Sequence, residues 1–85
     1  MRLVPTGGDS LNIIGGSQYN VISGTSAVGV VIAGGGSSSE PNIVSNWASY
    51  STIGGGARNF ITTTSFLLQQ YMTIAGGAYN EASST

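Results

Sequence analysis

Apolar and polar positions along this chain follow one phrase that occurs four times. An aliphatic residue precedes two or three glycines, and Asn, two mostly apolar residues and Ser or Thr come next. The leading isoleucines, taken as Ile13, Ile32, Ile53 and Ile74, are 19, 21 and 21 residues apart. A fixed period of about 20 residues is typical of repeat proteins, in which each turn buries its apolar side against its neighbours. The pattern therefore predicts a stack of equivalent turns.

Each repeat contains two short segments rich in β-branched and aromatic residues and bounded by Gly, Asn or Ser, which is the pattern of strands and turns. We expect strands before the glycines at 28–32, 50–53 and 71–74, and strands after the Asn at 19–23, 42–45 and 59–64. No window combines a period of 3.6 residues with helix caps. The predicted fold is an all-β repeat solenoid, built as a trimeric β-roll or as an interleaved triple β-helix.

The repeats divide the chain into two parts. Residues 1–10 are predicted to be a lead-in or attachment segment, with turn residues at Pro5 and Gly7–Gly8. Residues 11–85 form the predicted four-repeat solenoid domain. The segments 37–41 and 66–70 lengthen two of the repeats, and we expect them to be insertions at corners, where a solenoid tolerates them.

The repeated glycines and asparagines are predicted to form the corners of the coil. Glycine adopts a positive φ without a Cβ clash, and Asn tolerates the left-handed conformation and can bond its own backbone. Stacked copies of the Asn can also form a ladder. The predicted corner residues are Gly15, Gly16, Gly34, Gly35, Gly54, Gly55, Gly76, Gly77, Asn20, Asn42, Asn59 and Asn80.

The composition makes a stable monomer difficult. The chain has 85 residues, 14 of them glycine, and it has no Cys, His or Lys. A chain this short buries only about 60–65% of the surface that its unfolded form exposes. Charged residues are 6% of the chain, whereas about 25% is usual in a soluble domain. Association would relieve both the weak core and the poor solubility, so we predict an obligate homotrimer.

Several partners are excluded or disfavoured by the same composition. Two arginines cannot neutralise a run of phosphates, which argues against nucleic acid. The longest apolar run, residues 27–33, is far shorter than the roughly 18 residues of a membrane span. Residues 1–8 have one positive charge without an apolar segment behind it, unlike a secretory signal peptide.

One segment resembles known repeats. Residues 50–59, with the sequence YSTIGGGARN, are similar to the Gly-Gly-Gly-x-x-Asn repeats of trimeric autotransporter adhesin heads and of phage tail-fibre and decoration proteins, and residues 71–80 repeat the pattern. The resemblance covers about residues 11–85 and implies a homotrimer of stacked β-turns. The repeats here are longer and less regular, and SSSEP at 37–41 stands where two residues would be expected.

No catalytic constellation is visible in the sequence. The serines have no His to activate them, and the carboxylates Asp9, Glu40 and Glu81 lie in separate parts of the chain. Without His or Cys, we expect no metal site and no cofactor. Trp47 and Tyr50 are the aromatic residues of interest. They are predicted to fill the core or the subunit interface, and the alternative is contact with a ligand such as a cell-surface glycan.

Three functions are compatible with these observations. The preferred one is a non-enzymatic virion structural protein of a phage: a short fibre, spike or capsid-decorating protein, assembled in the host cytoplasm with other virion proteins. The lack of a signal-like segment favours it. The alternative is a head fragment of a bacterial surface adhesin. A curli-like functional amyloid is a further alternative, although Pro41 and the unequal insertions oppose in-register stacking.

Overall fold

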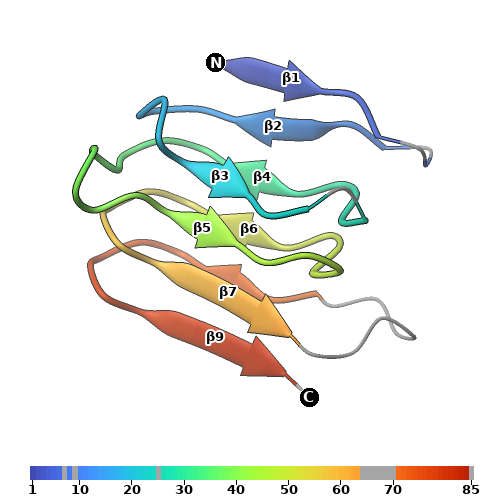
Figure 1. Ribbon diagram of the computed structural model, residues 1–85. Helices are drawn as coiled ribbons and strands as arrows, with labels where there is room; N and C mark the ends of the chain where they lie inside the picture. Colours follow the sequence, from blue (N-terminus) through green and yellow to red (C-terminus); the bar gives the residue numbers. More distant parts are fainter. Residues whose placement is uncertain (7, 9, 25, 64–70, 85) are drawn as a thin grey trace.

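The computed structural model describes residues 1–6, 8, 10–24, 26–63 and 71–84. The chain forms a β-solenoid of about three turns, and successive turns stack along one axis (Figure 1). The described residues contain strands, turns and bends but no helix. The predicted all-β solenoid is therefore confirmed. The predicted insertion at 66–70 lies outside the described residues.

Two sheets form opposite walls of the solenoid. The five-stranded sheet has the order β1-β2-β4-β6-β8, and the four-stranded sheet has the order β3-β5-β7-β9. The strands of the first sheet are β1 (Arg2–Val4), β2 (Asn12–Ile14), β4 (Val31–Ile32), β6 (Thr52–Ile53) and β8 (Thr73–Ile74). Those of the second are β3 (Val21–Ile22), β5 (Ile43–Val44), β7 (Phe60–Thr63) and β9 (Glu81–Ser84). All pairs are parallel except β1 with β2.

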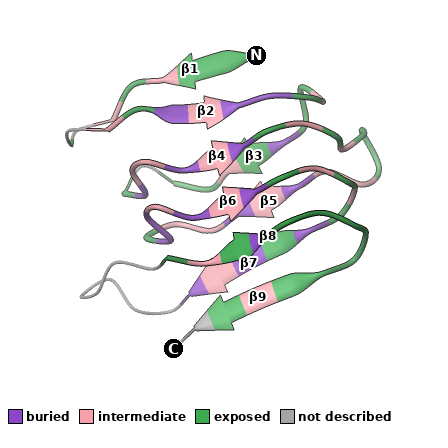
Figure 2. Cartoon of the chain, turned by 180° about the vertical axis from the view of Figure 1, so that it is seen from behind, coloured by how far each residue is buried: buried purple, intermediate pink, exposed green. Residues whose placement is uncertain are grey.

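The core lies between the two sheets and contains one aliphatic residue from almost every strand. Its buried members are Ile14, Ile32, Ile53 and Ile74 from the first sheet, Val44 and Ile61 from the second, and Ala27, Val30 and Ala48 from the connections. Figure 2 shows this buried interior running through the successive turns. Because side chains alternate across a strand, one residue of each two-residue strand faces inward and the other faces outward.

The register corrects one sequence assignment. Ile14 pairs with Ile32, and Ile13 pairs with Val31. The isoleucine that leads the first repeat is therefore Ile14, which is buried, while Ile13 is half-buried on the outer side. Two adjacent isoleucines leave the sequence pattern ambiguous by one residue, and in a strand that shift exchanges the two faces.

Several strands are shorter than predicted. The strand expected at 28–32 begins only at Val31, and the one expected at 50–53 begins at Thr52. Gly29 has a φ of 69° and Tyr50 has a φ of 59°. These positive φ values place a corner where extended backbone was expected.

At the N-terminal end of the coil, an additional strand, β1, extends the first sheet beyond β2, whereas β3 is the edge strand of the second sheet. β1 pairs antiparallel with β2, so residues 2–4 of the predicted lead-in segment belong to the first sheet. The Arg2 side chain donates to the carbonyl of Asn20 at 2.6 Å. In later turns the carbonyls of Asn42, Asn59 and Asn80 accept backbone N–H groups from the turn before. Arg2 therefore supplies the missing donor above β3.

Candidate functional site

A column of glycines forms one corner of the coil. Gly16, Gly35, Gly56 and Gly77 have φ values of 73°, 74°, 85° and 101°. A Cβ at Gly16 would overlap the carbonyl oxygen of Gly35, one at Gly35 that of Gly56, and one at Gly56 that of Gly77. These glycines are required because the backbone of one turn rests directly on the next.

The other corner glycines are less constrained. A Cβ at Gly34 or Gly76 would meet nothing within 4 Å, and neither residue has a positive φ, whereas Gly55 also has open space but a φ of 157°. At Gly15 and Gly54 a Cβ would overlap the carbonyls of Ala33 and Ala75. The predicted corner glycines therefore all lie at or beside the corner. Only at some of them does the backbone of the next turn come so close that a side chain would not fit.

The four predicted asparagines stack beside the glycines and form a ladder. Backbone N–H groups of Asn42, Asn59 and Asn80 donate to the side-chain oxygen of the asparagine one turn before, over 2.9, 3.0 and 3.2 Å. The side-chain amides donate to glycine carbonyls of their own turn and, for the first three, of the next turn. Asn20, Asn42 and Asn59 are fully buried. The ladder thus joins turns through neutral polar groups.

A row of side chains projects outward from the four-stranded sheet. Val21 pairs with Ile43, Ile43 with Phe60, and Phe60 with Glu81. We call these four residues the outer row. Val21 is 40% exposed and Phe60 is 37% exposed. Neighbouring strands lie about 4.8 Å apart, so three apolar side chains form a continuous strip that ends at a carboxylate.

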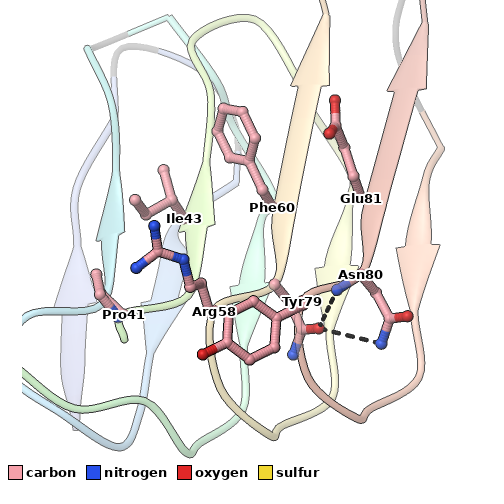
Figure 3. A pocket seen from close by; sticks show the side chains of 8 residues that line it. Pro41, Ile43, Arg58, Phe60, Tyr79, Asn80 and Glu81 are labelled. Carbon is pink, nitrogen blue, oxygen red and sulfur yellow. Dashed lines mark hydrogen bonds between the residues drawn. The ribbon is translucent and has the colours of Figure 1, made fainter. Parts of the chain in front are cut away.

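A groove of about 390 Å³ runs beside the lower part of the outer row. Its lining residues are Pro41, Ile43, Arg58, Asn59, Phe60, Tyr79, Asn80 and Glu81. Figure 3 shows Phe60 and Glu81 projecting to the same side of β7 and β9, with Arg58 and Tyr79 at the corner below them. The groove therefore combines apolar walls with one cationic and one anionic side chain.

Three side chains, those of Arg58, Tyr79 and Glu40, interact at the corner that precedes β7 and β9, at one end of the groove. The Arg58 guanidinium lies 5.8 Å from the ring centroid of Tyr79 and donates to the Ser39 carbonyl at 3.3 Å. The Tyr79 hydroxyl donates to the Glu40 carboxylate. This hydrogen bond, together with the negative charge of Glu40, raises the pKa of the Tyr79 phenol. Segment 37–41, predicted as an insertion, thus holds the base of the groove.

The two aromatic residues singled out from the sequence occupy the opposite side of the coil. Trp47 is 38% exposed and has a φ of 69°. Tyr50 is half-buried and stacks on Tyr71, with 5.6 Å between the ring centroids. The structure does not bring Trp47 or Tyr50 to the groove.

The described residues contain no group of three or more His, Cys, Asp or Glu that could hold a metal ion. Within the same ranges, no helix is long and apolar enough to cross a membrane. Buried side-chain polar atoms of the described part all have a hydrogen-bond partner. Within the described residues, we take the outer row with its groove as the candidate site, because it combines exposed apolar side chains with Arg58 and Glu81.

Sequence reasoning missed the outer row and the groove as a unit. The signal was present, since the residue after each asparagine is Val21, Ile43, Phe60 or Glu81. The register was needed to align these positions on one face. Comparison with protein-family models, curated proteins and solved structures finds no match for this chain.

Proposed function

We propose that this chain is a non-enzymatic structural protein of a phage particle, a short trimeric fibre, spike or capsid-decorating protein located in the virion. One observation carries the proposal: large apolar side chains remain exposed around the coil. They are Met1, Leu3, Leu11, Tyr19, Val21, Trp47, Phe60, Tyr71 and Tyr79. Of these, Val21 and Phe60 form a continuous strip with Ile43 on the four-stranded sheet, and contiguous exposed apolar surface marks sites of association.

The interior supports a scaffolding role. Stacked backbones, the glycine column and the asparagine ladder give a coil whose buried residues, within the described ranges, include no charged side chain. The resemblance of residues 50–59 to the repeats of trimeric fibre and adhesin heads supports an assembly of three copies. The proposed partners are two further copies of the chain and other virion proteins.

A trimeric adhesin head is the second candidate function. The observations that favour it are the partial exposure of Trp47 and the stacked pair of Tyr50 and Tyr71. Aromatic rings of this kind can pack against sugar rings, and the partner would be a cell-surface glycan. The location would then be the bacterial surface.

The substitution Trp47→Ala separates the two candidates. If Trp47 has a packing role in the folded assembly, its loss should lower the stability by about 2 kcal/mol, less than for a fully buried aromatic residue because Trp47 is 38% exposed. Thermal unfolding and attachment to cells or glycans are measured on the same protein. Trp47→Phe is the control and should retain most of the stability.

We expect the stability loss. Unchanged thermal unfolding of Trp47→Ala, together with loss of attachment, would favour the adhesin and contradict the proposed structural role.

A further inference from the structure

The outer row and the groove lie on one wall of the solenoid and have the features of a protein contact. The row is apolar over three consecutive turns, at Val21, Ile43 and Phe60. The corresponding row of the other sheet is Ile13, Val31, Thr52 and Thr73, and its lower half is polar. The apolar row of the four-stranded sheet therefore extends one turn further, to Phe60, where the five-stranded sheet presents the Thr52 hydroxyl, and in the following turn Glu81 corresponds to Thr73.

The groove has few polar groups to orient a small ligand. The Asn59 amide bonds Gly55 and Gly77, and the Asn80 amide bonds Gly76 and the Asn59 side chain. Small-molecule sites usually offer several convergent polar groups. What the groove offers instead is an apolar wall with two side chains of opposite charge, Arg58 and Glu81.

Charge complementarity favours a second copy of this chain as the occupant. Arg58 and Glu81 are both exposed and belong to successive turns. In a cyclic trimer whose axis is parallel to the solenoid axis, each contact joins two different parts of the same surface. Corresponding turns of the three copies then lie at the same position along the trimer axis. Arg58 of one copy would lie one strand spacing, about 4.8 Å, above Glu81 of the next, a step that long side chains can bridge.

Resting on the proposed homotrimer, we propose that copies pack through the outer face of the four-stranded sheet. The apolar outer-row residues face the axis, and Arg58 of each copy pairs with Glu81 of its neighbour. This pairing also neutralises the three Glu81 carboxylates, which would otherwise repel one another near the axis. The net charge of −1 per chain adds little repulsion to the assembly.

The apolar contact is tested with the full chain at micromolar concentration by native mass measurement and sedimentation. Phe60→Glu should weaken the trimer at least about tenfold. Phe60→Thr should weaken it less, and it keeps a strand-forming residue, as at Thr52 and Thr73 of the other sheet. Thr52→Glu is the matched control, because Thr52 and Phe60 each directly precede a buried isoleucine. It should leave the trimer unchanged.

The charge pair is tested by exchange. Arg58→Glu and Glu81→Arg should each weaken the trimer about tenfold, and the double variant should recover most of the loss. The contacts of Arg58 with Ser39 and Tyr79 are absent in the Arg58→Glu single variant and in the double variant alike. Recovery therefore reports the new pair rather than these contacts.

The outcomes separate this inference from the proposed function. A wild-type monomer at these concentrations would contradict the trimer itself. A wild-type trimer that Phe60→Glu leaves intact, or a double exchange that recovers nothing, would overturn only the proposed interface. If the trimer persists in Phe60→Glu while binding of a saccharide or another protein is lost, the groove serves that partner and the inference is wrong.

Discussion

Asn42 illustrates how one side chain joins three turns of the coil. Its backbone N–H donates to the Asn20 side chain in the turn before, and its side-chain oxygen accepts the N–H of Asn59 in the turn after. Its amide donates to the carbonyls of Gly34 and Gly56 at 3.2 and 3.1 Å. Since Asn42 is fully buried, any group left without its partner stays away from water.

Asn42→Ala should therefore be strongly destabilising. The change removes three side-chain hydrogen bonds and leaves a buried N–H and two carbonyls with fewer partners, at a cost of about 3 kcal/mol. Asn80→Ala should cost less, about 1 kcal/mol, because Asn80 is exposed in the last turn. Urea unfolding of the two variants measures the difference.

Ser38→Ala is the control for this pair, since Ser38 is exposed in the 37–41 segment. Equal unfolding of Asn42→Ala and Ser38→Ala would show that the ladder does not stabilise the fold.

At the scale of elements, corners rather than strands define this fold. Most strands are two residues long, so a turn gains little from strand length and depends on how closely its corners stack. The glycine column meets this need because each of its first three members lies against the carbonyl of the next turn. Positive φ at Trp47, Tyr50, Arg58 and Tyr79 shows that non-glycine residues also form corners, where they cost backbone strain.

Two neighbouring glycines give a direct comparison. Gly35→Ala should destabilise the protein by about 2 kcal/mol, because φ is 74° and the new Cβ would overlap the Gly56 carbonyl. Gly34→Ala should be neutral or slightly stabilising, because its Cβ would meet open space at an ordinary φ. Thermal unfolding of both variants decides the point, and a larger loss for Gly34→Ala would contradict the corner geometry.

The sequence could predict the repeat and the β-solenoid, because both follow from local chemistry repeated at one period. It did not single out Gly56, which belongs to the glycine column although only Gly54 and Gly55 of its triplet were predicted as corner residues. It could not decide between Ile13 and Ile14, since both are aliphatic and only pairing with Val31 and Ile32 fixes the face. The strand ends near Gly29 and Tyr50 were also missed, because the valines on either side of Gly29 and the Tyr50 side chain favour extended backbone.

The candidate surface was missed for a different reason. Phe60 and Glu81 are 21 residues apart in a chain whose repeats differ in length, and Arg58 reaches the same groove from a corner. Only the register of β7 with β9 places Phe60 beside Glu81. Whether side chains from different turns meet in one groove depends on how loops of unequal length keep the strands in register. Local propensities do not determine this.

At the scale of the whole molecule, the coil leaves much apolar surface uncovered. The core is narrow, since each turn contributes about two aliphatic side chains to it, and several large apolar residues remain outside. Burying apolar area contributes about 25 cal/mol per Å². We therefore expect contacts between copies, rather than contacts within one chain, to provide a substantial part of the stability, so that folding is coupled to association.

Thermal unfolding of the wild-type protein at several concentrations tests this claim most directly. For a trimer that unfolds to monomers, mass action raises Tm with concentration, by roughly 10 °C for a hundredfold increase in a domain of this size. We predict such a rise between low and high micromolar protein. A Tm that stays constant over that range, with the mass of a folded monomer throughout, would contradict the account.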